Sequence, residues 1–527
     1  MKHYQIFIVW IGLFVLSCQS PQKEEAPSLT HLPLNDRLER IFGENKEEKL
    51  NFELKFSKEI QQLYTLNSNK SYWFQDDSLS PVAFQLIHFF DSTEYYGLPK
   101  HLYPINIEKQ GKDPLQIELA LTESLFRIIK HFQFGVLDSG TTNISWNLSH
   151  LSDSIPLFVR NNFKDSLFHY KIRSFEPQSF HYQWVVRSWK NHLLKNNLDS
   201  TRFTVPPMKK DSLKAYQIAR EILLHKKYLD SVSYAKDSLF LLALEKYQED
   251  HNLKGDHVIG SNTIVALEKS NWDKFEQVAV VLEKLKWTRD LPEKYFRVNI
   301  GEQKLILVDS NRIIREHRII VGHFDTQTPE LQSKMNRIIL YPYWNVPHSI
   351  SSKELVYGAR RDTGYMRKNN YKVFRNKEEV DLSTIDWKKY SKDKFPFRIR
   401  QEPGPKNSLG LIKFQFPNKH SVYIHDTPTK WLFKTKMRYY SHGCMRLENP
   451  RDLAHYLIAT DPKNRFIADS LDVELEKAKN QSIPLKQSIP IFIEYRTVNA
   501  DSTGKISFYN DYYGRDQAII RALFQKP

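Results

Sequence analysis

Two short stretches, 421-SVYIHDTP-428 and 440-YSHGCMR-446, bring a histidine, a glycine and a cysteine close together in the chain. In the first stretch Val422 and Ile424 alternate with Tyr423 and His425, which is the period-two pattern of a strand. His425 is therefore expected to project from one face of that strand. The Asp-Thr-Pro sequence that follows is expected to end it.

The second stretch has a glycine between His442 and Cys444, which suits a tight turn with exposed backbone N–H groups. A free thiol has a pKa near 8.5, so it needs a base at neutral pH. An imidazole can take the thiol proton and later return it to a leaving amine. Two consecutive N–H groups at a Gly-Cys turn can stabilise an oxyanion. The residues therefore suggest Cys444 as a nucleophile, with a buried core cysteine as the alternative.

Around these stretches the sequence predicts a β-rich domain over residues 290–500. After Pro292 the apolar residues change to a period of two, as in Phe296, Val298 and Ile300. An insertion at about 349–403 is rich in Lys, Arg, Tyr and Asp. Loops of this length are usually functional or mobile.

Residues 46–205 are expected to form a helical scaffold. The clearest helix spans 115–134, where the apolar spacings 4, 4, 3 and 4 define one face. The residues on that face are Ile117, Leu121, Leu125, Ile128 and Phe132. No catalytic constellation stands out in this part.

Residues 211–272 are expected to be a separate small helical unit. Its pattern, 247-YQEDHNL-253 followed by 258-VIG-260 and 263-TIVAL-267, resembles the peptidoglycan-binding domain type 1. Asn252 and His257 stand where that domain usually has glycine, and any three-helix module remains an alternative. His251 and His257 have no cysteine or acidic partners at ligand spacing, so no metal is expected here.

The N-terminus is expected to carry a signal peptide over residues 1–17. The apolar run 6–16 is too short to span a bilayer. It ends in Val-Leu-Ser-Cys18, which resembles a bacterial lipobox, so Cys18 is the expected lipid attachment point. An ordinary signal peptide is the alternative. Residues 18–45 are expected to be a tether. Lys23-Glu24-Glu25 just after the cysteine is similar to export signals of some Bacteroidetes lipoproteins, so a Gram-negative, Bacteroidetes-like envelope and an outer-membrane location are expected. The periplasmic face is favoured because peptidoglycan lies there.

Composition excludes several classes of protein. Two cysteines in 527 residues exclude a disulfide scaffold. Aromatic residues make up 13%, which is too many for a largely disordered chain. The chain has 77 Lys and Arg against 61 Asp and Glu, a net charge of +16. Export makes nucleic acid an unlikely reason for this charge, and no nucleic-acid partner is expected.

The Ser-His-Gly-Cys stretch, with His425 upstream, resembles the signature of the L,D-transpeptidase (YkuD-type) catalytic domain, and its flanks resemble the YcbB-like subgroup. These flanks are 328-TP-329, 343-YWNVP-347, 403-PGPKNSLG-410, 413-KF-414, 416-FPN-418, 425-HDTP-428 and 438-RYYS-441. The resemblance covers about residues 45–500. Met445 departs conservatively from it, since a small β-branched residue is common there. The implied fold is α+β and multidomain: a helical scaffold, a three-helix unit and a β-sandwich-like catalytic domain with an inserted cap.

The resemblance also implies roles for individual residues. Cys444 would be the nucleophile, and His425 its base and proton donor. Asp426 would orient His425 through its backbone carbonyl, although ending a strand is an equally good role for it. The remaining implied residues are His442 and Gly443 at the oxyanion, and Ser441, Arg446 and Tyr423 at the substrate.

The implied reaction joins peptidoglycan stem peptides by 3→3 cross-links with release of D-Ala. The partners would be a tetrapeptide donor, a diamino-acid acceptor and the membrane that holds the lipid. No metal or cofactor is expected. Two alternatives remain open: an L,D-carboxypeptidase that uses the same residues, and a cell-wall-binding lipoprotein without activity.

Overall fold

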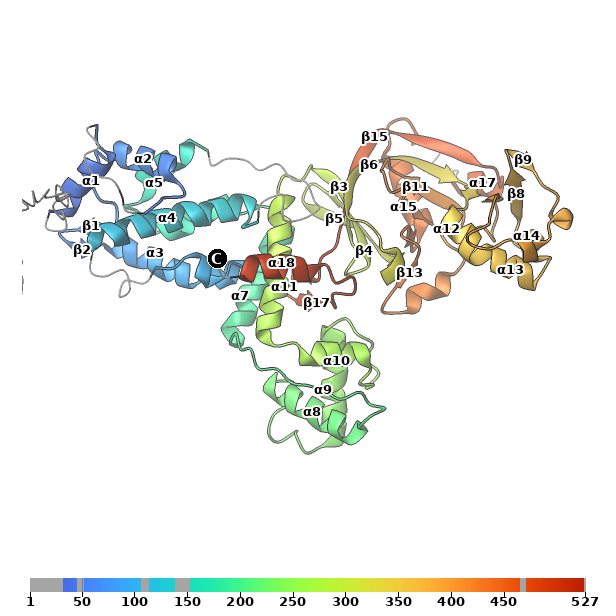
Figure 1. Ribbon diagram of the computed structural model, residues 1–527, viewed down its shortest axis with the longest axis horizontal. Helices are drawn as coiled ribbons and strands as arrows, with labels where there is room; N and C mark the ends of the chain where they lie inside the picture. Colours follow the sequence, from blue (N-terminus) through green and yellow to red (C-terminus); the bar gives the residue numbers. More distant parts are fainter. Residues whose placement is uncertain are drawn as a thin grey trace, which may run out of the picture. The chain divides into compact units, whose positions relative to one another are not determined.

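The computed structural model describes residues 32–44, 50, 52–105, 113–137, 152–464 and 471–525. The expected signal peptide and Cys18 lie outside the described residues. The chain divides into two compact units (Figure 1). The first contains Met1–Ile87, Ile105–Phe126 and Ser152–Phe168, and the second contains His88–Pro104, Arg127–Leu151 and His169–Pro527. No helix among the described residues is long and apolar enough to cross a membrane.

The first unit is mainly helical. Its elements are α1 (Leu34–Phe42), α2 (Ser57–Leu66), the hairpin β1 (Phe74–Gln75) and β2 (Ser78–Leu79), α5 (Ser154–Asn162), and the N-terminal parts of α3 (Pro81–Asp91) and α4 (Pro114–Phe134). The α4 helix agrees with the helix expected at 115–134. Helix α1 lies within the segment expected to be a tether and buries Leu38 and Phe42.

A buried carboxylate organises this unit. Glu118 accepts hydrogen bonds from the Tyr64 hydroxyl (2.9 Å), the Ser71 hydroxyl (2.8 Å) and the Tyr72 N–H (2.7 Å). Burial raises the pKa of this carboxyl, whereas the hydrogen bonds oppose that shift. The contacts are structural and do not resemble a catalytic site.

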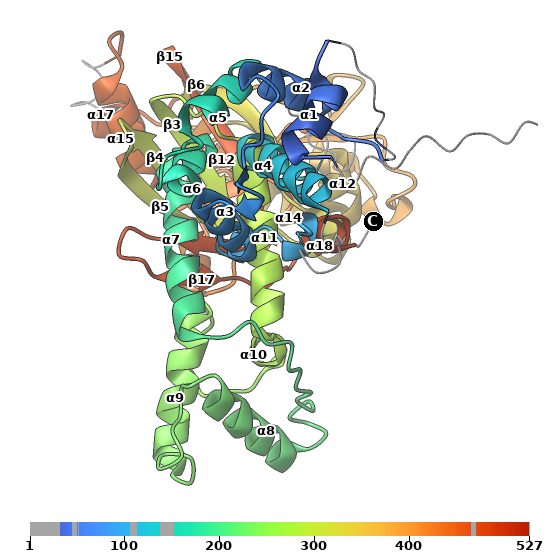
Figure 2. The same cartoon turned by 90° about the vertical axis from the view of Figure 1, so that its left-hand side faces the viewer.

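The second unit begins with helices. They are η2 (Thr93–Tyr96), η3 (Lys100–Leu102), α6 (Phe168–Lys171), η5 (Ile172–Phe175), α7 (Phe180–Lys195), α8 (Ser212–His225), α9 (Asp237–Asp250), α10 (Ser261–Glu268) and α11 (Asn271–Trp287). Helices α8, α9 and α10 lie together (Figure 2) around a core of their own that includes Ile222, Leu244 and Tyr247. They occupy the segment 211–272. Its peptidoglycan-binding role stays a prediction.

A nine-stranded sheet forms the β-rich part of this unit. Its strands run in the order β13-β5-β14-β12-β11-β6-β15-β3-β4. They are β3 (Lys294–Asn299), β4 (Lys304–Asp309), β5 (Arg312–Gly322), β6 (Leu331–Leu340), β11 (Ile412–Gln415), β12 (Ile424–His425), β13 (Tyr439–Ser441), β14 (Met445–Leu447) and β15 (Gln481–Glu494). Strand β4 also pairs with β5, so the sheet closes on itself. One continuous sheet therefore curves around the core, and the β-rich domain expected from the sequence is confirmed.

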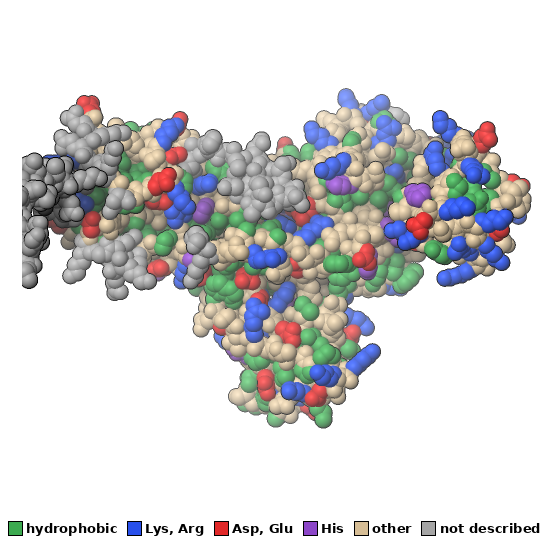
Figure 3. Space-filling model, in the orientation of Figure 1, with side chains coloured by type: hydrophobic (Ala, Val, Ile, Leu, Met, Phe, Trp, Pro, Cys, Tyr) green, Lys and Arg blue, Asp and Glu red, His purple; other side chains and the backbone are tan. Residues whose placement is uncertain are grey.

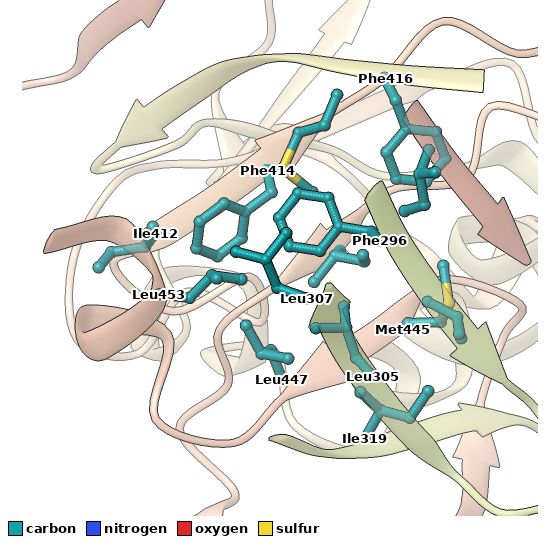
Figure 4. Close-up of a cluster of buried hydrophobic side chains, with 14 of the residues drawn as sticks. Phe296, Leu305, Leu307, Ile319, Ile412, Phe414, Phe416, Met445, Leu447 and Leu453 are labelled. Carbon is teal, nitrogen blue, oxygen red and sulfur yellow. The ribbon is translucent and has the colours of Figure 1, made fainter. Parts of the chain in front are cut away.

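The core of this sheet is aliphatic and aromatic. Figure 4 shows Phe296, Leu305 and Phe414 converging with Leu453 from α15 (Pro450–Thr460). Each of these four side chains is fully buried, which contributes roughly 1.5–3 kcal/mol per residue. Helix α17 (Leu471–Glu476) adds Leu471 and Leu475 to the same core. The core fills one face of β11, β12 and β14 and leaves their other face to the candidate site.

The insertion is a folded cap with a core of its own. It contains α12 (His348–Ile350), the π-helix η7 (Ser351–Leu355), α13 (Val356–Arg361), α14 (Tyr365–Lys368), η8 (Leu382–Thr384) and η9 (Trp387–Lys389). A four-stranded sheet joins β7 (Trp344–Asn345), β10 (Arg398–Gln401), β8 (Tyr371–Arg375) and β9 (Glu378–Glu379). Val356 and Trp387 lie in its core.

The cap is rich in basic residues. Residues 347–401 hold 14 Lys and Arg against 7 Asp and Glu, and their blue side chains gather at this end of the molecule in Figure 3. Some of these charges already have partners within the cap. The Arg360 guanidinium donates to the Tyr390 carbonyl (2.6 Å), and Lys368 pairs with Asp362 (2.7 Å).

The structure continues past residue 500, the expected end of the β-rich domain, with a hairpin and a last helix. Strands β16 (Val498–Ala500) and β17 (Ile506–Phe508) pair with each other and precede α18 (Asp516–Phe524). Ile519 and Leu523 of α18 pack on Val280 of α11. The last described residues therefore belong to the compact unit that holds the sheet.

Candidate active site

The candidate site lies on the face of the sheet opposite the hydrophobic core. In β12 His425 pairs with Lys413 of β11 and with Arg446 of β14. Their strand neighbours Ile424 and Met445 are fully buried in the core, so the three polar side chains share the outer face. Tyr423 lies on this face too, with its ring centroid 5.7 Å from that of His425.

His425 is held in one tautomer. Its Nδ1 lies 2.5 Å from the Asp426 carbonyl oxygen, which can only accept, so Nδ1 carries the proton. Its Nε2 therefore has a free lone pair. Burial lowers the pKa of His425 to about 3, and the positive charges of Arg446, Lys413 and Lys430 add to the effect. The imidazole is neutral at physiological pH and can accept a proton.

The Asp426 carboxylate points away from His425. It accepts the backbone N–H groups of Leu411 (2.9 Å) and Thr427 (2.7 Å) and contacts the Lys430 ammonium. Gly410 packs directly against it in a left-handed conformation (φ 61°), where a Cβ would lie 2.3 Å from the carboxyl carbon. Asp426 thus reaches His425 only through its carbonyl, in the contact expected from the sequence.

Cys444 lies just before β14, where the next residue's N–H donates to the Tyr423 carbonyl (3.0 Å). Its thiol is half-buried, and burial raises the thiol pKa. The Tyr423 backbone and hydroxyl and the Lys413 ammonium favour the thiolate and oppose that shift. Lys413 also sits over the Tyr423 ring, 3.8 Å from its centroid. The resting site therefore holds a neutral thiol beside a neutral imidazole.

This protonation state predicts how alkylation of Cys444 depends on pH. In a Cys18→Ala chain, Cys444 is the only cysteine. Its rate of reaction with iodoacetamide is expected to rise about tenfold per pH unit from pH 6 to 8, because the thiolate fraction rises in that way below the thiol pKa. Intact-protein mass spectrometry measures the rate. A plateau over this range would instead indicate a thiolate–imidazolium pair and contradict the assignment.

The turn that carries the thiol needs its glycine. Gly443 has φ 105°, a conformation that residues with a side chain rarely adopt. Its N–H donates to the Ser441 hydroxyl (3.3 Å), and its carbonyl accepts from the Thr328 hydroxyl (2.9 Å). The Ser441 side chain is 3% exposed and faces inward. The Ser441 hydroxyl thus supports the turn, and its expected contact with substrate stays a prediction.

The other expected residues surround this turn. The exposed His442 ring points to the cap, where its Nε2 lies 2.6 Å from a carboxylate oxygen of Glu354. The half-buried Arg446 guanidinium donates to the Thr429 hydroxyl (3.2 Å). Burial lowers the pKa of Arg446. Within the described residues, the side chains of His442 and Arg446 form these hydrogen bonds and none to Cys444.

A cavity of about 520 Å³ opens on the same side of the sheet. Lys413, one of the residues that line it, is also the strand partner of His425. Arg337 is its second cation, and no carboxylate lines it. The remaining lining residues are Asn336, Ile339, Pro342, Tyr343, Asn345, Gln415, Pro417, Asn480 and Ser482. Within the described residues no group of three or more His, Cys, Asp or Glu could hold a metal ion.

Sequence reasoning gave no role to Lys413, Thr328, Glu354 or Tyr513. The alternation of Lys413 with Ile412 and Phe414 places it on the outer face, and this signal could have been used. Thr328, Glu354 and Tyr513 take part only through contacts with residues that are distant in the sequence.

Comparisons with known proteins agree with this geometry. The family described as the L,D-transpeptidase catalytic domain (YkuD) matches residues 293–464, and a family described as a scaffold domain matches residues 58–188. A Haemophilus influenzae protein named "Putative L,D-transpeptidase" is 32% identical over 245 residues, which cover 46% of this chain and 49% of that protein. The chain thus spans about half the length of this curated relative. The segment that carries His425 and Cys444 matches the L,D-transpeptidase catalytic domain.

Proposed function

We propose that the chain is a peptidoglycan L,D-transpeptidase that forms 3→3 cross-links through a thioester on Cys444. The observation that carries the proposal is the placement of Cys444 beside the strand of His425, whose unprotonated Nε2 can act as a base. The match of residues 293–464 to the catalytic domain family supports the same reaction.

In the first half of the reaction, the Cys444 sulfur attacks the carbonyl that joins the diamino acid at position 3 to D-Ala at position 4. His425 Nε2 takes the thiol proton and transfers it to the nitrogen of D-Ala as the C–N bond breaks. In the second half, an amine of another stem peptide attacks the thioester. Its proton returns through His425 to the departing sulfur.

The substrate class is supported by the charges beside the thiol. Strands lie about 4.8 Å apart, so Lys413 is one strand spacing from His425. One extended residue spans about 3.3 Å, so a carboxylate one residue beyond the scissile bond can reach the Lys413 ammonium. We assign this contact to the carboxylate of D-Ala. The cavity that Lys413 lines, with Arg337 and several amides, suits the further polar groups of a stem peptide.

The Lys413→Met variant tests this assignment. It is expected to raise KM for a disaccharide-tetrapeptide roughly tenfold, since hydrogen bonds to charged groups contribute about 1.5–3 kcal/mol. The same donor with a C-terminal amide should lose little further affinity in the variant. The matched control is Lys419→Met, an exposed lysine beyond β11. An equal loss for the acid and the amide in both variants would contradict a carboxylate contact at Lys413.

Two further features complete the proposal. Cys18 would carry lipid that holds the chain on the periplasmic face of an outer membrane, and residues 211–272 would bind peptidoglycan. A mature N-terminus that begins with an acylated Cys18 would support the anchor. Sedimentation with purified sacculi, lost when 211–272 is exchanged for an unrelated three-helix unit, would support the binding role.

A further inference from the structure

A buried threonine, Thr328, supports the turn that carries Cys444 through a hydrogen bond. The Thr328 side chain is fully buried. Its hydroxyl donates to the Gly443 carbonyl (2.9 Å) and accepts the Gly322 N–H (2.9 Å). One hydroxyl therefore connects the end of β5 to the residue that precedes Cys444.

Thr328 is in turn held by the C-terminal segment between β17 and α18. The Tyr513 hydroxyl donates to the Gly322 carbonyl (2.6 Å) and accepts the Thr328 N–H (3.3 Å). The Arg515 guanidinium donates to the Thr328 carbonyl (3.0 Å). The backbone and the hydroxyl of Thr328 are thus both fixed. Tyr513 and Arg515 lie outside the matched segment 293–464.

The direction of the Cys444 N–H follows from this arrangement. The peptide bond between Gly443 and Cys444 is trans, so its C=O and N–H point in opposite directions. Because Thr328 holds the C=O toward the protein interior, the N–H points away from Thr328. This N–H has no recorded acceptor within the described residues.

We propose that Thr328, braced by Tyr513, is the positioning residue that aims the Cys444 N–H at the oxyanion of the acyl-transfer step. Thr328 touches no reacting atom and acts only through the peptide plane that it anchors. The inference rests on the proposed function in that Cys444 must be the acylated residue. It concerns any acyl donor, whether or not that donor comes from peptidoglycan.

Two thiol reagents distinguish a role of Thr328 in positioning the oxyanion donor from a general role in holding the structure together. Cys444 attacks the carbonyl of p-nitrophenyl acetate, passes through an oxyanion, and becomes an acetyl thioester as p-nitrophenolate leaves. It attacks the carbon of iodoacetamide with loss of iodide, and no oxyanion forms. Both reactions need the same thiolate, so the ratio of their rates isolates the oxyanion donor.

The experiment uses the full chain with Cys18→Ala, so that Cys444 is the only thiol. Thr328→Val is expected to slow acylation by p-nitrophenyl acetate about 100-fold, the usual effect of one lost oxyanion donor. Alkylation by iodoacetamide should stay within about twofold. Thr328→Ser, which keeps the hydroxyl, should restore acylation. Tyr513→Phe removes only the bracing hydroxyl and should slow acylation about tenfold.

Acylation and alkylation that fall together in Thr328→Val and Tyr513→Phe would overturn the proposal, and so would unchanged acylation in both. Tyr513→Phe keeps its ring packing, so it still decides the matter if Thr328→Val does not fold. The proposed function fails separately. A parent chain that is acylated by p-nitrophenyl acetate but releases no D-Ala from a tetrapeptide would refute the transpeptidase and leave the role of Thr328 intact.

Discussion

Cys444→Ala is expected to abolish both D-Ala release and cross-linked product from a disaccharide-tetrapeptide. Cys444 is the one free cysteine in the described part of the chain, and alanine leaves no thiol that can form the acyl-enzyme. Mass spectrometry of the products, with the purified protein and the tetrapeptide alone, measures both species. The loss should exceed a thousandfold.

Cys444→Ser is the matched control for this variant. It keeps the size and the hydrogen-bonding capacity of the side chain but replaces the thiol by a much weaker nucleophile, so its activity should also be lost. Tripeptide without dimer from the parent chain would move the function to a carboxypeptidase. Equal turnover by the parent chain and Cys444→Ala would contradict the whole site.

His425→Gln is expected to lower kcat/KM by about a hundredfold to ten-thousandfold, the range for loss of a general acid–base. Glutamine is polar and similar in size, but it cannot take the thiol proton.

The kcat/KM of the wild-type protein should not fall on the acid side of pH 6.5. Because the pKa of His425 lies at about 3, the imidazole stays neutral as the pH falls through 6 and 5 and is protonated only near pH 3.

The profile of kcat/KM between pH 4 and 9 tests this point, since it reports the groups of the free enzyme. The profile should stay nearly flat from pH 4 to 8, with no inflection near 6.5, because the neutral thiol and the neutral imidazole that react both persist over this range. The control is His442→Gln, whose ring lies at the cap and not beside the thiol. An inflection at pH 6.5 that is present in the parent protein and absent in His425→Gln would contradict this prediction. It would show that His425 is exposed to solvent and has the ordinary pKa of a histidine.

Local patterns predicted the parts of the site that depend on neighbouring residues. The alternation of Tyr423 and His425 with buried residues gave the correct face of the strand, and the glycine before Cys444 predicted a turn. The 3.6-residue period gave the long helix α4 almost to the residue. In each case the signal lies within a few residues of the feature.

Contacts between distant segments could not be predicted in this way. Thr328 and Glu354 contact the turn that carries Cys444 only through folding, and so does Tyr513 when it contacts Thr328. Nothing near these residues in the sequence marks the contacts. The insertion was expected from its length and its resemblance to be a cap, but no local pattern predicted the core that Val356 and Trp387 give it. Closure of the sheet depends on the β4–β5 pairing, whose two strands look ordinary.

The brace at Tyr513 has a consequence for the order in which the protein becomes active. Synthesis runs from the N-terminus, so Cys444 leaves the ribosome about seventy residues before Tyr513 and Arg515 do. During that interval the chain has a thiol but lacks the groups that fix Thr328. A nascent or truncated chain that stops short of residue 513 would therefore be a poor acyl-transfer catalyst, even though His425, Gly443 and Cys444 are all present.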